Sequence, residues 1–76
     1  MISVNIKFKN GYEARFNSSS QQELGNNIID FIQCFKSLTE DEVGYLYGQL
    51  VVNDLNIGLN NLKLNNYIKD YNIEVI

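Results

Sequence analysis

Alternation of apolar and polar residues over the first sixteen positions is the feature of this chain that most constrains its fold. The apolar positions are Ile2, Val4, Ile6 and Phe8, followed after Asn10-Gly11 by Tyr12, Ala14 and Phe16. A repeat of two residues turns one face of a strand toward a core and the other toward solvent. The pattern therefore predicts a β-hairpin with one buried face.

The length of the loop decides which side chains of this hairpin share a face. A two-residue loop at Asn10-Gly11 mixes apolar and polar residues on both faces. A three-residue loop with Gly11 in the left-handed conformation of a G1 bulge keeps every apolar residue on one face. That register pairs Phe8 with Tyr12, Ile6 with Ala14, Val4 with Phe16, Lys7 with Glu13 and Asn5 with Arg15. We expect the bulged loop.

A single main helix is expected after the hairpin, from Ser20 to Phe35. Ser20 and Glu23 have the spacing of a capping box, in which each side chain accepts a hydrogen bond from the other residue's backbone N–H. Apolar residues then recur at helical spacing and predict a core stripe, with Ile29 at its rim. The stripe consists of Leu24, Ile28, Phe31, Ile32 and Phe35.

The second half of the chain gives weaker signals. Residues 39–52 are open between a helix, capped by Thr39 to Glu42, and strands rich in Tyr and Val with Gly44 and Gly48 as helix-weakening residues. Residues 53–61 are predicted as a polar loop, and residues 62–67 as a short helical turn. Residues 72–76 predict a final strand with Ile73 and Val75 facing inward. No linker divides the chain, so residues 1–76 are expected to form one domain.

Composition excludes several functions. Six basic and nine acidic residues give a net charge of −3, which disfavours nucleic acid because phosphate binding needs clustered Lys and Arg. The chain has no His, one Cys (Cys34) and five scattered Gly, so no catalytic residue, cofactor or phosphate loop is expected. The adjacent carboxylates of residues 40–42 lack the spacing of a calcium loop, and no metal site is expected. The chain contains no apolar run long enough to cross a membrane, so membrane insertion is not expected. A cytoplasmic protein is expected.

Two stretches in the second half resemble ubiquitin-like domains. Gly48-Gln49-Leu50-Val51-Val52-Asn53-Asp54 resembles a Gly-Gln-Leu stretch of the ubiquitin-like accessory protein of Gram-positive type VII secretion systems. The segment from Leu64 to Ile76 resembles the ending "Leu-x-x-Tyr, Ile-x-Asp, Ile-x-Val" of ubiquitin-like domains. The resemblance implies an α+β ubiquitin-like β-grasp, in which the helix packs on a mixed sheet and the middle of the chain supplies strands.

The expected function is a non-enzymatic, non-conjugatable protein-interaction module, because the chain ends in the stiff residues Val75 and Ile76 rather than in Gly-Gly. By resemblance it regulates or assists a type VII secretion system. The alternative is a small phage or mobile-element inhibitor that blocks a host or defence protein. The expected contact residues for a protein partner are Lys7, Arg15, Tyr45 and Tyr47. An unpaired sheet edge also leaves a homodimer open.

Overall fold

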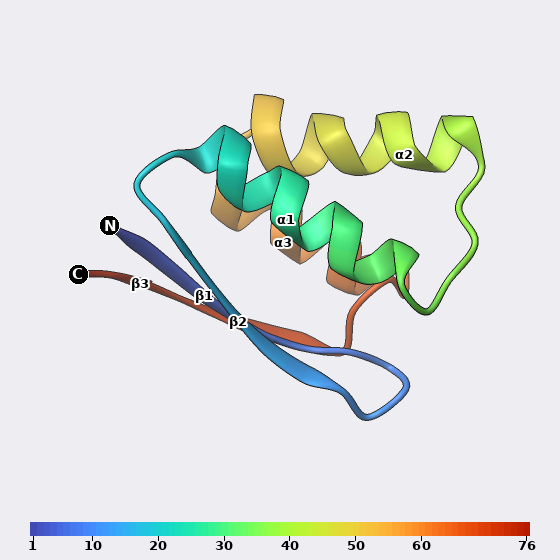
Figure 1. Cartoon of the computed structure of the whole chain (residues 1–76), viewed down its shortest axis with the longest axis horizontal. Helices are drawn as coiled ribbons and strands as arrows, with labels where there is room; N and C mark the ends of the chain where they lie inside the picture. The colour runs from blue at the N-terminus through green and yellow to red at the C-terminus, as the bar shows by residue number, and fades with distance from the viewer.

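The computed structural model describes all 76 residues and has two layers, a three-stranded sheet and a set of helices that cover only one of its faces (Figure 1). The elements are β1 (Ile2–Lys7), β2 (Glu13–Ser18), α1 (Gln21–Gln33), α2 (Glu40–Tyr47), the π-helical turn η1 (Gly48–Val52), α3 (Leu55–Leu64) and β3 (Asp70–Val75). The strand order is β2-β1-β3, and both pairs are antiparallel. The fold class is therefore α+β with an antiparallel sheet.

The hairpin prediction is confirmed in register and in loop type. Val4 lies opposite Phe16, and Ile6 lies opposite Ala14. Gly11 has φ +89°, and the Phe8 N–H donates to the Tyr12 carbonyl at 2.7 Å, as a G1 bulge requires. The inner face of β1 supplies Val4, Ile6 and Phe8 to a core of 13 buried apolar residues.

The main helix begins as predicted but is capped differently. The Ser20 hydroxyl accepts from the Glu23 N–H at 3.4 Å, whereas the Ser20 N–H donates to the Ser18 hydroxyl and not to Glu23. The helix ends at Gln33, two residues before the predicted end. Ile29 is only 5% exposed and belongs to the core, so its prediction as a rim residue is wrong. The reason is that η1 and α2 pack against α1 in addition to β2.

Residues 40–52 are helical, which decides between the two interpretations of the middle of the chain. Thr39 and Glu42 form a complete capping box at the start of α2. Leu46 and Leu50 lie four residues apart and are fully buried on one side of α2 and η1. The burial of these two leucines outweighs the weak helix propensity of the neighbouring glycines. A single main helix and strands in the middle of the chain are therefore wrong predictions.

The mixed sheet of a ubiquitin-like β-grasp is also a wrong prediction. The Lys69 N–H donates to the Lys7 carbonyl at 2.8 Å, so the chain enters β3 at the end of the sheet where β1 finishes. A strand that starts there must run antiparallel to β1. Asp70 is accordingly opposite Lys7, and Val75 is opposite Ile2.

Residues 55–64 form α3, where a loop was predicted. The Asp54 side chain caps this helix by accepting from the N–H groups of Asn56 and Ile57 at 3.0 and 3.2 Å. Leu55, Leu59 and Leu62 follow at helical spacing and are buried. The predicted turn at residues 62–67 is thus the end of α3 and the bend that follows it. The asparagines of this segment and Gly58 are typical of a loop, and they led to the prediction of a loop over residues 53–61.

The π-helical turn joins the three helices through backbone contacts. The Asn53 N–H donates to the Gly48 carbonyl at 2.9 Å, which leaves other carbonyls of the turn free. The Gln21 side chain donates to the carbonyls of Leu50, Val51 and Asn53 at 3.1, 3.3 and 2.7 Å. On the opposite side, α3 approaches so closely that a Cβ on Gly58 would overlap the Gln49 carbonyl.

The last strand runs over residues 70–75 rather than over residues 72–76. Ile73 is half-buried against the core, as predicted. Val75 lies on the same face by alternation but is 80% exposed, because it extends past the edge of the core. Val75 thus has the predicted inward orientation but is not covered by the core.

We expect the Gly58→Ala variant to lose about 3 kcal/mol of unfolding free energy or more, because the added methyl group meets backbone that cannot move aside. Gly44→Ala is the matched control, since a Cβ there has no neighbour within 4 Å. It should gain about 0.5 to 1 kcal/mol from helix propensity alone. Urea unfolding of both variants measures the difference. Equal effects of the two substitutions would contradict the close packing of α3 on η1.

We expect the Gln21→Met variant to lose about 1 to 2 kcal/mol of stability, because it keeps the length of the side chain but removes the only amide donor to three carbonyls. Gln22→Met is the control, since Gln22 is exposed in the same turn of α1. Its effect should stay within about 0.5 kcal/mol. Thermal unfolding of the two variants compares them, and an unchanged melting temperature for Gln21→Met would refute the proposed bridging role.

Candidate functional site

The candidate site is the face of the sheet that the helices leave open. Alternation along the strands places only polar side chains on this face. They are Ser3, Asn5 and Lys7 of β1, Glu13, Arg15 and Asn17 of β2, and Asp70, Asn72 and Glu74 of β3. Antiparallel sheets often leave one face to solvent, so polarity by itself does not define a binding site. The geometry of individual groups on this face is more informative.

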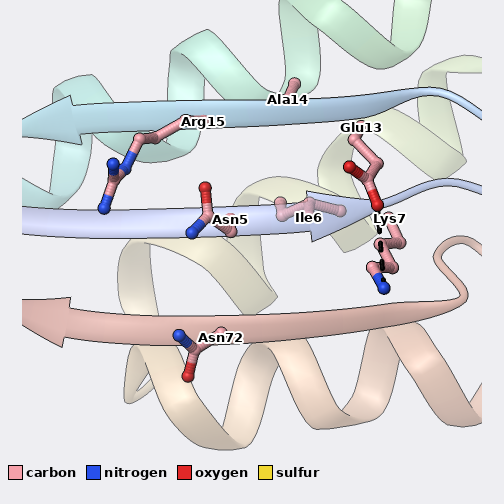
Figure 2. Close-up of a pocket in the computed structure, with 7 residues that line it drawn as sticks. All are labelled: Asn5, Ile6, Lys7, Glu13, Ala14, Arg15 and Asn72. Carbon is pink, nitrogen blue, oxygen red and sulfur yellow. Dashed lines mark ion pairs between the residues drawn. The ribbon is translucent and has the colours of Figure 1, made fainter.

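A shallow hollow of about 490 Å³ lies over the centre of this face. Figure 2 shows that Arg15, Asn5 and Asn72 lie side by side across the three strands, with the helices behind the sheet. The remaining lining residues are Ile6, Lys7, Glu13 and Ala14. Asn5 is exposed on the central strand, opposite Arg15 of β2 and Asn72 of β3, and it therefore lies in the middle of the hollow.

Arg15 is held in place from within the sheet. Its Nε donates to the Ser3 hydroxyl at 2.9 Å, and its Nη2 lies 3.5 Å from Glu74 Oε2. Ser3 is 1% exposed, although it lies on the open face. The side chain of Arg15 is 53% exposed, so its terminal nitrogens still reach solvent. A guanidinium oriented in this way is well suited to bind a carboxylate.

The other charges of the open face also form pairs at the surface. Lys7 Nζ lies 3.6 Å from Glu13 Oε1, and both side chains are more than half exposed. The Tyr71 N–H and the Lys63 ammonium lower the pKa of Asp70 below its usual value, so this carboxylate stays charged at neutral pH. Exposed ion pairs of this kind contribute little stability. Their partners are therefore easily exchanged for those of another molecule.

The structure brings together only part of the predicted contact set. Lys7 and Arg15 both line the hollow, whereas Tyr45 and Tyr47 lie on α2 in the helical layer (Figure 1). Two residues apart on a helix, the tyrosines point in different directions instead of sharing the face of a strand. The two rings therefore do not form one contact surface. Tyr47 is 38% exposed and remains accessible as a single ring.

Tyr45 belongs to a polar cluster that ties α2 to the bend after α3. Its hydroxyl accepts from Asn65 Nδ2 at 2.7 Å, and its ring stacks on Tyr67 at 5.8 Å. The Tyr67 hydroxyl donates to Glu42 at 3.2 Å, and burial raises the pKa of Tyr67. The Thr39 N–H lowers the pKa of Glu42. These contacts explain Tyr45 as a structural residue.

Several side chains of the candidate site were not predicted from the sequence. Asn5 and Asn72 line the hollow, and Ser3 orients Arg15. The alternation pattern already places Asn5 beside Arg15, but nothing in it reveals that an arginine side chain covers Ser3. Cys34 is exposed at the end of α1, far from the open face. No group of three His, Cys, Asp or Glu side chains is arranged to hold a metal ion.

Comparison of the chain with protein-family models, curated proteins and solved structures gives no match. None of the helices combines the length and the apolar character needed to cross a membrane.

A double-mutant cycle of Arg15→Ala and Glu74→Ala should give a coupling free energy of about 0.5 kcal/mol, because both side chains are about half exposed. The coupling should fall further when salt is raised, since screening weakens exposed pairs. Urea unfolding of the four proteins at low and high salt measures it. A coupling above about 2 kcal/mol would mean that Arg15 is locked to Glu74 and is not available to a partner.

Proposed function

We propose that this protein is a non-enzymatic binding module that recognises a protein partner through the open face of its sheet. The observation that carries the proposal is the guanidinium of Arg15, oriented by the buried Ser3 hydroxyl beside an exposed hollow. Two amide side chains and the ammonium of Lys7 complete the hollow. The complementary partner surface carries carboxylate and amide groups.

The energetics of this face favour exchange of its ion partners. Lys7 and Arg15 each have a carboxylate neighbour at 3.5 to 3.6 Å and keep more than half of their side chains in solvent. Replacing one exposed carboxylate with that of a partner costs little. The guanidinium loses little additional freedom on binding, because Ser3 already fixes Nε.

A role as an accessory protein of a type VII secretion system is compatible with such a module but rests on the sequence resemblance alone. The mixed sheet that the resemblance implies is absent. The proposed function therefore depends on the open face and not on a ubiquitin-like fold.

A second candidate function is a phage or mobile-element inhibitor that covers a basic surface of another protein. The observation that favours it is the distribution of unpaired acids. Five carboxylates take part in none of the four ion pairs. Four of them, those of Glu23, Asp30, Glu40 and Asp41, lie on α1 and α2, and the fifth, that of Asp54, caps α3. In this function, the acidic surface with which this protein binds a partner would lie on the helical layer, on the side of the molecule opposite the hollow.

Photo-crosslinking in the native host separates the two functions. A photoreactive phenylalanine replaces Asn5 in the hollow or, in a second variant, the exposed Asn27 on α1. We expect a discrete crosslinked protein from position 5 and not from position 27. Mass spectrometry of the crosslinked band identifies the partner.

Charge reversal provides the control for this experiment. Arg15→Glu should abolish the crosslink from position 5, whereas Lys36→Glu, the same change on the helical side, should leave it intact. Lys36 is paired with Glu42 at 3.6 Å, much as Arg15 is with Glu74. A crosslink found only from position 27, and insensitive to Arg15→Glu, would reject the open-face module and favour the inhibitor.

A further inference from the structure

The outer edge of β3 has backbone groups with no partner in the chain. β3 is a border strand of the sheet. The Ile76 N–H donates to the Met1 carbonyl at 2.8 Å, and antiparallel bonding alternates along the strand from this pair. Glu74 and Asn72 therefore bond to β1, while Tyr71, Ile73 and Val75 direct their backbone groups outward. The Tyr71 N–H donates to the carboxylate of the adjacent Asp70 at 2.9 Å, so the groups without a partner are the C=O of Tyr71 and both groups of Ile73 and Val75.

β3 has only part of the usual protection of an edge strand, namely the carboxylates of Asp70 and Glu74 on its open face. Its sequence Asp-Tyr-Asn-Ile-Glu-Val contains no Pro and no Lys, and its inner face carries no charge. Val75 and Ile76 are 80% and 71% exposed, and Met1 beside them is 60% exposed. An exposed apolar edge of this kind favours addition of another strand.

Charge decides in which register two copies of β3 fit together. Symmetric antiparallel pairing about Asn72 places Asp70 opposite Glu74 of the second copy, and pairing about Glu74 places two glutamates opposite each other. Both registers oppose like charges, which is unfavourable. Pairing about Ile73 instead places Asn72 opposite Glu74 and Tyr71 opposite Val75, so no carboxylate faces another. This register also uses all three residues whose backbone points outward.

The edge of β2 is less suited to the same contact. Its best symmetric register pairs Glu13 with Arg15 of the second copy, but both side chains already have ion partners within the chain. The residue at the centre of that register is Ala14, which offers little apolar area. β3 supplies Tyr71, Ile73 and Val75, all of high β-propensity, whereas Phe16 is the one such residue of β2.

We infer that this protein forms a homodimer in which the β3 strands of two copies pair antiparallel about Ile73. The pairing joins the two sheets into one of six strands, with both helical layers on one side. The contact is isologous and closes on itself. It does not depend on the proposed function, because the backbone edge of β3 lies outside the hollow.

Cysteine trapping tests the register directly, in a background with Cys34→Ser. Asn72 and Glu74 of the two copies form a non-hydrogen-bonded pair with a Cα separation of about 4.5 Å, which a disulfide spans. We expect an oxidised mixture of the Asn72→Cys and Glu74→Cys proteins to form the mixed dimer. Each protein alone should form much less covalent dimer. Preferential self-linking of either variant, or no crosslink in the mixture, would overturn the inferred register.

Proline substitution tests the edge without a new thiol. Val75→Pro removes an outward N–H and no bond to β1, so the monomer should keep its fold while dimerisation weakens at least tenfold. Asn17→Pro makes the same change on the β2 edge and should leave the dimer intact. Because strand addition buries a small area, we expect dimers only above about 100 μM. Sedimentation equilibrium of the three proteins up to about ten times this concentration measures the association. A wild-type monomer throughout, or loss of the dimer only in Asn17→Pro, would reject the β3 dimer.

Discussion

The contact of Gly58 with the Gln49 carbonyl determines where the last third of the chain can lie. Since glycine has no side chain, α3 approaches η1 backbone to backbone. Leu59 and Leu62 are then fully buried beneath it. The chain leaves α3 through Asn66, whose φ of 66° turns it back toward the sheet. It therefore reaches β1 at Lys7, and the antiparallel direction of β3 follows from this arrangement.

The same packing gives the two faces of the sheet different roles. Three helices and the π-helical turn share one face, where β1 contributes its apolar residues to the core (Figure 1). No helix packs on the other face, and its polar groups are satisfied by cross-strand pairs, by the contact of Asp70 with Lys63 of α3, or by solvent. Arg15 combines a cross-strand contact with solvent, since its Nε donates to the buried Ser3 hydroxyl while its side chain stays 53% exposed. The hydrogen bond that satisfies the buried Ser3 hydroxyl thus also orients the guanidinium of Arg15.

The sequence predicts the hairpin and the start of α1 well because both depend on local patterns. Alternation, a G1 loop and a serine cap act over a few residues, and no distant contact reverses them. The helical middle depends on a distant contact, since Gln21 supplies the donors for η1 from about thirty residues away. α3 was not predicted because its asparagines are typical of a loop. The cap residue Asp54 and the helical spacing of Leu55, Leu59 and Leu62 could have indicated the helix. The position of Arg15 and Lys7 on the open face could be predicted from the alternation in the hairpin. The burial of Ser3 could not, because it also depends on β3, which places Glu74 opposite Ser3.

The open face and the β3 edge are separate surfaces, and their binding partners approach from different directions. Strand addition extends the sheet within its own plane, whereas a partner in the hollow approaches along the normal to that plane (Figure 2). A two-fold axis that relates antiparallel strands of one sheet runs along that normal, so both hollows of a dimer look the same way. A partner with two equivalent acidic sites would then bind with a higher effective concentration at its second contact. A face whose individual ion pairs are weak gains most from such an arrangement, because each exposed pair alone contributes little.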